Sequence, residues 1–114
     1  MRSNLEGDRP VGTKSRASRA RAQTKQVCER DIEAALVKQV EAAGGKIRKV
    51  RWLGRDGAPD RRVLGIAWVE VKRPGGVLSP RQVREIDEMR KCGERVVVIS
   101  TFKEIDDFVR SIVW

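Results

Sequence analysis

A strand–helix–strand unit in the C-terminal half constrains the fold of this chain more than any other feature. Residues 66–72 and 95–100 read as strands, and the second is apolar at its centre, as expected of a strand buried on both faces. The helix between them, residues 81–92, has Ser79 at its N-cap and Gln82 three residues later, which is a capping box. A helix between two strands predicts a right-handed parallel crossover, and therefore an α/β fold.

The remaining elements extend this unit to a domain over residues 27–114. They are a helix over 27–43 that ends at Gly44-Gly45, strands over 46–52 and 60–64, and a last helix capped by Thr101 with Glu104. The strands over 60–64 and 66–72 form a tight antiparallel hairpin around Gly65. In the last two helices the predicted inner residues are Val83, Ile86, Met89, Ile105, Phe108, Val109 and Ile112. The order α-β-β-β-α-β-α predicts a mixed central sheet flanked by helices.

The first 26 residues differ from the rest in charge and pattern. They hold seven Lys or Arg against Glu6 and Asp8 and show no hydrophobic periodicity, so we predict a flexible basic arm. Residues 27–114 hold eighteen Lys or Arg against fourteen acidic residues, and the whole chain carries +9. A basic chain favours polyanions, of which nucleic acid is the commonest.

Composition also excludes several classes of protein and of catalytic chemistry. The chain has no His and no Tyr, which removes Ser-His-Asp triads, His-based zinc sites and Tyr nucleophiles. No apolar run approaches the roughly 20 residues that a membrane helix needs, and no secretory signal is evident. Cys28 and Cys92 lack metal-ligand spacing, so we expect reduced thiols and a cytoplasmic setting. An enzyme of this composition would depend on carboxylates and Lys, with a metal ion.

The stretch GAPDRRVLGIAWVEVK, residues 57–72, carries such a set. Strand side chains alternate between faces, so Glu70 and Lys72 share one face, and Asp60 at the start of the preceding strand can approach Glu70. Two converging carboxylates repel each other unless a cation joins them, and hard cations such as Mg²⁺ or Mn²⁺ suit oxygen ligands. A metal so held, with a Lys nearby, meets the needs of phosphodiester hydrolysis.

The motifs Pro59-Asp60, Glu70-Val71-Lys72 and SPRQ with Gln82 together resemble the VRR-NUC family, a branch of the PD-(D/E)XK nuclease superfamily. The likeness covers about residues 27–110. It implies a PD-(D/E)XK nuclease-like core and a Mg²⁺- or Mn²⁺-dependent endonuclease that cuts DNA. Small stand-alone phage and bacterial members act as homodimers on branched DNA such as Holliday junctions. The resemblance therefore implies DNA, branched or duplex, as the partner, and a bacterial or phage-infected cell as the setting.

The resemblance also implies a role for each motif residue. Asp60 and Glu70 would bind the metal, with the main-chain carbonyl of Val71 as a third ligand. Lys72 would serve the attacking water and Gln82 would support the water or the phosphate. The family's first helix brings one more carboxylate, which is Glu29 by its distance to Gly44, with Glu33 one turn later as the alternative.

Each of these residues also has a structural interpretation. Asp60 can be a turn residue, Gln82 a capping residue and Glu29 a first-turn carboxylate favoured by the helix dipole, while Glu70 and Lys72 can form an exposed ion pair. Arg61, Arg62, Lys49 and Arg73 are either phosphate contacts or surface charge, and Trp52 and Trp68 are expected to pack. A catalytically silent nucleic-acid-binding module is the main alternative function, and a structural part of a larger assembly is another.

Overall fold

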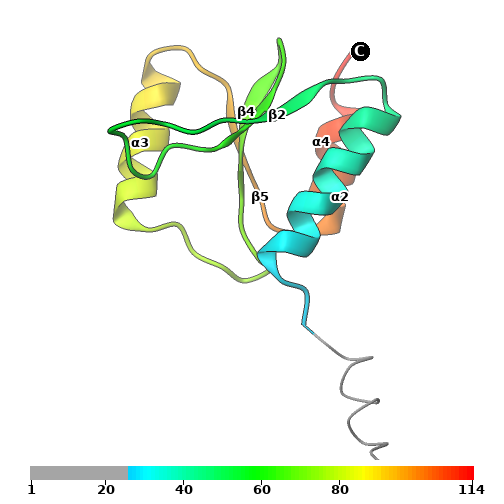
Figure 1. Ribbon diagram of the computed structural model, residues 1–114, viewed down its shortest axis with the longest axis horizontal. Helices are drawn as coiled ribbons and strands as arrows, with labels where there is room; N and C mark the ends of the chain where they lie inside the picture. Colours follow the sequence, from blue (N-terminus) through cyan, green and yellow to red (C-terminus); the bar gives the residue numbers. More distant parts are fainter. Residues whose placement is uncertain (1–25) are drawn as a thin grey trace, which may run out of the picture.

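The computed structural model describes residues 26–114, so the predicted basic arm, residues 1–26, lies outside this part except for its last residue. The elements are α2 (Glu29–Ala42), β2 (Ile47–Lys49), β3 (Arg61–Val63), β4 (Ala67–Val71), α3 (Pro80–Lys91), β5 (Val96–Ile99) and α4 (Phe102–Arg110). This is the predicted order, with shorter strands (Figure 1). No helix within residues 26–114 is long and apolar enough to cross a membrane.

The four strands form one mixed sheet in the order β2-β3-β4-β5. The pairs β2–β3 and β3–β4 are antiparallel, and β4–β5 is parallel, as the strand–helix–strand unit predicts. Gly65 turns the β3–β4 hairpin at a φ of 75°, a conformation that glycine adopts without steric cost. The bounds predicted for the strand over 46–52 are the least accurate, because only Ile47–Lys49 pair as a strand before the chain turns away from the sheet.

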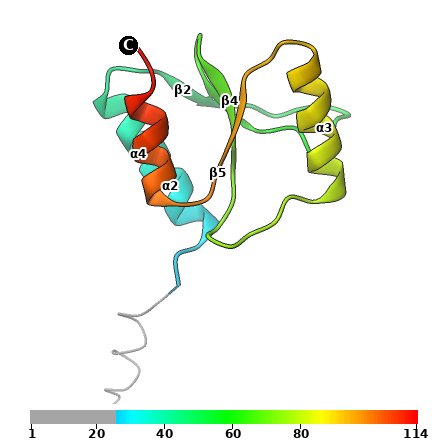
Figure 2. The same cartoon turned by 180° about the vertical axis from the view of Figure 1, so that it is seen from behind.

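Helices cover both faces of this sheet, with α2 and α4 on one face and α3 on the other (Figures 1 and 2). The larger core lies between the sheet and the α2–α4 pair and includes Ile32, Leu36, Val69, Ile99 and Ile105. Each such side chain stabilises the fold by about 1.5–3 kcal/mol through burial. A smaller cluster lies under α3 and contains Ile86, Met89 and Val96, with Trp52, Trp68, Leu78 and Val98 packed against it.

Three predictions about these helices and strands are wrong in detail. Val83 was expected to face inward but is 50% exposed, because only Ile86 and Met89 of α3 are buried. Val97 and Val98 are half-buried rather than fully buried, because β5 is an edge strand. The Glu104 carboxylate accepts from the backbone N–H of Ser100 at 2.7 Å, so the reciprocal half of the predicted capping box forms one residue earlier than Thr101.

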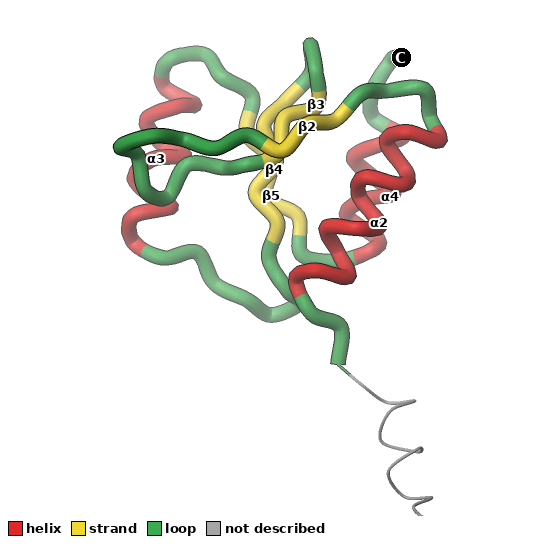
Figure 3. Tube along the Cα trace, viewed as in Figure 1, coloured by secondary structure: helices red, strands yellow, loops and turns green. Residues whose placement is uncertain are grey.

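The segment between β2 and β3 leaves the sheet and reaches α3 (Figure 3). Arg55 Nη2 contacts Glu85 Oε1 at 2.6 Å, and Arg81 forms an ion pair with Asp56. Gly57, with a φ of 88°, lies so close to α3 that an added Cβ would be 2.8 Å from the carbonyl oxygen of Arg81. The glycine of the GAPD motif is therefore needed where the segment contacts the start of α3.

Candidate active site

Asp60 and Glu70 lie opposite each other on neighbouring strands. The register of β3 and β4 pairs Arg61 with Val69, so the next pair is Asp60 opposite Glu70. Asp60 still belongs to the sheet ladder, because its carbonyl accepts from the backbone N–H of Val50 at 2.8 Å. Residues opposite each other in an antiparallel pair direct their side chains to the same face. The two carboxylates therefore converge on the α3 face of the sheet.

Glu70 is the only buried charged side chain within residues 26–114, at 8% exposure. Burial raises its pKa to about 7, and the negative charges of Asp60, Glu29 and Glu33 act in the same direction. The positive charge of Lys72 acts against them. A carboxylate buried among like charges is costly unless a cation or a proton neutralises it. This strand end is therefore a place where a cation would be strongly stabilised.

Gln82 contacts Glu70 directly. Its Nε2 donates to Glu70 Oε2 at 3.0 Å, and its Oε1 accepts from the backbone N–H of Ser79 at 2.8 Å. The capping box predicted from the sequence is present, and the same side chain also reaches the carboxylate. The capping role and a role in the site are thus compatible in one residue.

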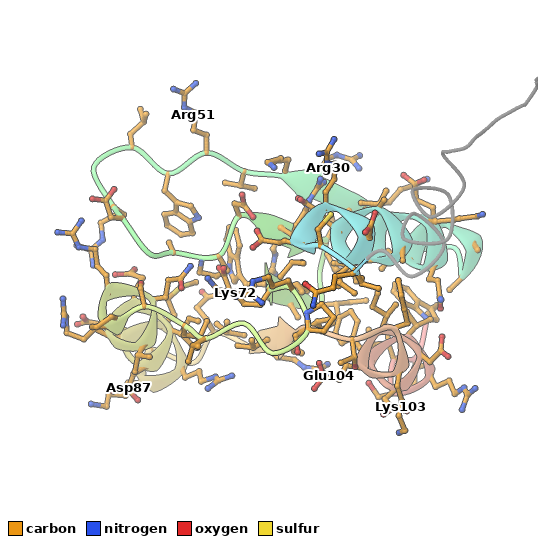
Figure 4. The ribbon with its side chains drawn as sticks, turned by 90° about the horizontal axis from the view of Figure 1, so that it is seen from below. Arg30, Arg51, Lys72, Asp87, Lys103 and Glu104 are labelled. Atoms are coloured by element: carbon orange, nitrogen blue, oxygen red, sulfur yellow. The ribbon has the colours of Figure 1, made fainter. Side chains whose placement is uncertain are left out.

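Lys72 follows β4 two residues after Glu70, and its backbone N–H donates to the carbonyl of Ile99 at 2.9 Å. This bond continues the parallel pairing of β4 with β5 beyond Val71. Lys72 is half-buried and lies between α2 and α3 when the molecule is seen from below (Figure 4). The positive charge of Lys72 acts on Glu70, which puts the ammonium group near that carboxylate.

Two carboxylates of α2, Glu29 and Glu33, act on Glu70, and they differ in their own contacts. Glu33 Oε2 accepts from Arg61 Nε at 2.6 Å and from Lys49 Nζ at 3.3 Å. Burial alone would raise the pKa of Glu33, but the hydrogen bonds and charges of Arg61 and Lys49 outweigh it and hold the pKa below its usual value. Glu29 is exposed in the first turn and forms no ion pair with another residue of 26–114. Glu29 is therefore the α2 carboxylate that remains available to a ligand.

The basic residues expected beside the site make different contacts. Arg61 lies on the α2 face and pairs with Glu33, while Lys49 pairs with Glu33 and lies 3.8 Å from Asp60 Oδ2. Arg62 lies over the ring of Trp68, with its Cζ 5.3 Å from the ring centroid. Arg73 is exposed. Strand alternation alone would have separated Arg61 from Arg62, since successive residues face opposite sides; the ion pairs themselves have no signal in the sequence.

A tryptophan pair supports the start of β3 from the α3 face. The Trp52 and Trp68 ring centroids are 4.9 Å apart, and Trp52 Nε1 donates to the carbonyl of Pro59 at 2.7 Å. Pro59 is fully buried and precedes Asp60. These tryptophans pack, as predicted, and their packing fixes the backbone from which the Asp60 side chain projects.

The donor set at this strand end fits a hard divalent cation. Within residues 26–114 no group of three or more His, Cys, Asp or Glu side chains is close enough to hold a metal ion. The predicted set needs only two, the carboxylates of Asp60 and Glu70, with the main-chain carbonyl of Val71 as the third oxygen. All three are hard oxygen donors, and Mg²⁺ in particular uses one or two carboxylates and keeps several waters.

Comparisons with known proteins show what this chain is similar to. No family model matches the chain. A protein of Acyrthosiphon pisum secondary endosymbiont phage 1, described as "Putative nuclease p44", is 38% identical over 77 residues, which cover 64% of this chain and 83% of the phage protein. A solved structure described as a VRR_NUC domain superposes with a TM-score of 0.67 at 33% identity, over 75% of this chain and 97% of that one.

Proposed function

Because the chain belongs to the VRR-NUC family of nucleases, we propose that it is a Mg²⁺- or Mn²⁺-dependent endonuclease that hydrolyses phosphodiester bonds of DNA. Branched DNA such as a Holliday junction is the proposed substrate, and a homodimer the proposed active form. The convergence of Asp60 and the buried Glu70 on one face of the sheet is the observation that carries this proposal.

Asp60, Glu70 and the Val71 carbonyl would hold the metal ion. Such an ion supplies a bound water of lowered pKa and stabilises negative charge on the phosphoryl oxygens. Glu70 is suited to this role because its carboxylate is buried and its pKa is raised by burial and by neighbouring carboxylates. The proposed preference for Mg²⁺ or Mn²⁺ follows from the all-oxygen donor set.

The remaining residues of the site act on the water and on the ligands. Lys72 Nζ would orient the attacking water or take part in its deprotonation, since Lys72 lies two residues after Glu70 and alternation puts both side chains on one face. Gln82 holds the Glu70 carboxylate through the 3.0 Å hydrogen bond to Oε2, so that Oε1 would be available to hold the ion. Glu29 would complete the outer shell of the site from the first turn of α2, where its charge acts on Glu70.

The substrate and assembly parts of the proposal have separate support. The chain carries a net charge of +9, which favours a phosphate backbone over other partners. A symmetric dimer would present two equivalent sites, which suits paired nicks on a four-way junction. The phage relative supports a setting in a bacterial or phage-infected cell, where the protein would act in the cytoplasm.

Cleavage assays on two substrates test the activity. Purified full-length protein is incubated with plasmid DNA and with a synthetic four-way junction, in Mg²⁺, Mn²⁺ or EDTA, with duplex, flap, single-strand and RNA controls. Asp60→Asn and Lys72→Ala are expected to abolish cleavage while DNA binding persists. The matched controls are Asp87→Asn and Lys103→Ala, whose residues form i,i+4 ion pairs on the exposed surfaces of α3 and α4.

The outcomes separate an enzyme from the binding module. Product in Mg²⁺ or Mn²⁺ that disappears in EDTA and in the two site variants supports the proposal. DNA binding without product under any metal would favour the catalytically silent module. Cleavage retained by Asp60→Asn would remove this site from the reaction.

A further inference from the structure

The basic side chains around the carboxylates fall into two groups. Those of the first group are already engaged by acidic partners: Lys49 and Arg61 with Glu33, Arg55 with Glu85, and Arg81 with Asp56. The exposed arginines Arg30, Arg51 and Arg73 form no ion pair with any other residue of 26–114, and Arg30 and Arg51 are the two that follow residues linked to the carboxylate pair. A guanidinium group without a carboxylate partner remains available to an anion from outside the protein.

Arg51 is placed by the sheet. It comes directly after Val50, whose backbone N–H bonds to the carbonyl of Asp60 at 2.8 Å. Arg51 therefore begins the segment that leaves the sheet beside the first carboxylate of the site. Its backbone position is supported by the following residue, Trp52, which packs on Trp68 and hydrogen-bonds to Pro59.

Arg30 is placed by α2. It follows Glu29, whose negative charge acts on Glu70, and it lies in the first turn of a helix that is anchored to the sheet by Glu33 and Arg61. Each of the two arginines is thus adjacent in sequence to a residue that contacts or influences the carboxylate pair. They project from two different elements, α2 and the segment after β2.

Figure 4 shows how these side chains lie when the molecule is seen from below. Arg30 and Arg51 project to the same side of the molecule, one from α2 and the other from the segment after β2. Lys72 lies between α2 and α3, while Asp87, Lys103 and Glu104 lie on the opposite side, on α3 and α4. Arg30 and Arg51 thus lie on one side of the molecule, and each is next in sequence to a residue that acts on the carboxylate pair or is bonded to it.

We propose that Arg30 and Arg51 are the phosphate-binding residues of this site and hold the substrate backbone on the side of the molecule from which both project. This inference rests on the proposed function, since it takes the substrate to be a nucleic acid. Arginine binds phosphate oxygens through paired N–H groups, and contacts to phosphates set the register of a nucleic acid without reading its sequence. Arg30 and Arg51 thereby decide which phosphodiester bond lies over Asp60 and Glu70.

Binding measured without cleavage tests this assignment. The affinity of the full chain for a fluorescently labelled four-way junction is determined by anisotropy in EDTA at several salt concentrations. Because each neutralised phosphate contributes about 0.9 to the slope of log affinity against log salt, Arg30→Gln and Arg51→Gln should each lower the slope by about one unit. The double variant should lower it by about two units and weaken binding more than either single variant.

Two matched variants make the result specific. Arg110→Gln removes the same charge from the exposed end of α4 and is expected to leave the slope unchanged. Arg73→Gln removes an exposed charge just after Lys72 and tests whether the nucleic-acid backbone follows the loop between β4 and α3 instead. Circular dichroism tests whether each variant is folded. If Arg30→Gln is not folded, the salt slope of Arg51→Gln, which changes an exposed residue, decides the assignment alone.

The assignment is overturned if Arg30→Gln and Arg51→Gln change the slope no more than Arg110→Gln does, or if Arg73→Gln alone changes it. This outcome is distinct from a failure of the proposed function. If the slopes change as predicted but DNA is never cleaved, the phosphate contacts are supported and the proposed nuclease activity is refuted. A protein that cleaves DNA with unchanged slopes would keep the activity and lose these contacts.

Discussion

Gln82 donates its side-chain amide to Glu70 while the same side chain caps the helix on which it lies. The Nε2–Oε2 distance to Glu70 is 3.0 Å, and Oε1 accepts from the Ser79 backbone N–H at 2.8 Å. The Ser79 hydroxyl in turn accepts from the Gln82 backbone N–H at 3.1 Å. The start of α3 and the orientation of the buried carboxylate are therefore fixed by one amide group.

Replacing Gln82 should affect stability and cleavage, whereas replacing Ser79 should affect mainly stability. Both Gln82→Ala and Ser79→Ala remove part of the cap, which lowers the free energy of unfolding by about 1 kcal/mol. Only Gln82→Ala releases the Glu70 carboxylate, so we expect it to lower the cleavage rate by about 10- to 100-fold, as for other partners of metal ligands. Denaturant unfolding and single-turnover cleavage measure the two effects. Equal loss of cleavage in both variants would mean that the helix start, rather than the bond to Glu70, is what the reaction needs.

Glu70 should make the protein less stable as pH rises. Its pKa is about 7 in the folded protein against an ordinary value of 4.5, so the folded state binds more protons between these pH values than the unfolded state does. The free energy of unfolding should therefore fall as pH rises through this window, by about 3 kcal/mol at most. Glu70→Gln should remove the loss, so that the variant is more stable than the unchanged protein at pH 8 but not at pH 4.

Glu104 offers a control of opposite sign for the Glu70 variant. A hydrogen bond from the Ser100 backbone lowers the pKa of Glu104, so its contribution is present above the ordinary pKa and is lost as pH falls through the folded-state value. Glu104→Gln should thus reduce stability at pH 7 and not at low pH. Denaturant unfolding in the absence of divalent ions measures both variants. Parallel pH profiles for Glu70→Gln and the unchanged protein would contradict the burial of a titrating carboxylate.

Glu29 and Glu33 should separate into a functional and a structural residue. Glu33 is mostly buried and bonds to Arg61 at 2.6 Å, so Glu33→Gln should lower the free energy of unfolding by about 1–3 kcal/mol. Exposed Glu29 has no such partner within residues 26–114, so Glu29→Gln should change stability by less than about 0.5 kcal/mol and should lower the cleavage rate. Thermal unfolding and cleavage per folded molecule decide between them. If Glu29→Gln keeps full activity while Glu33→Gln is folded but inactive, Glu33 is the functional residue and Glu29 is not.

The fold could be predicted because its signals are local. Ser79 with Gln82 and the glycine at position 65 each specify a boundary through contacts within a few residues, and the structure confirms both. Errors arose where the result depends on distant neighbours. Whether Val83 and Val98 are buried is decided by how far α3 covers the sheet and by the absence of a further strand beside β5 in the described part of the chain.

The same distinction holds for the site. Strand alternation was enough to put Glu70 and Lys72 on one face, and the hairpin was enough to bring Asp60 toward Glu70. Our proposal of Glu29 rather than Glu33 needed three-dimensional information, because it depends on the contact of Glu33 with Arg61, 28 residues away along the chain. The engagement of Lys49 and Arg61 by Glu33 likewise comes from the packing of α2 on the sheet.

Arg90 should protect the open edge of the sheet. The carbonyls of Arg95 and Ile99 accept hydrogen bonds from β4, so the Val96 carbonyl that alternates with them faces away from the sheet. Arg90 bonds to this carbonyl through Nη2 at 2.7 Å and Nε at 3.2 Å. Open edges with apolar side chains pair with other chains unless a charge or a covering group prevents it. We therefore expect Arg90→Ala to self-associate at concentrations where the unchanged protein does not.

Size-exclusion chromatography with light scattering, over a series of protein concentrations, measures this effect. Arg84→Ala is the matched control, because Arg84 is an exposed arginine of the same helix and forms no hydrogen bond with β5. Arg90→Lys keeps the charge but cannot donate two bonds to one carbonyl, so it should fall between Arg90→Ala and the unchanged protein. If Arg90→Ala and Arg84→Ala associate equally, loss of surface charge explains the result and the bond to Val96 does not protect the edge.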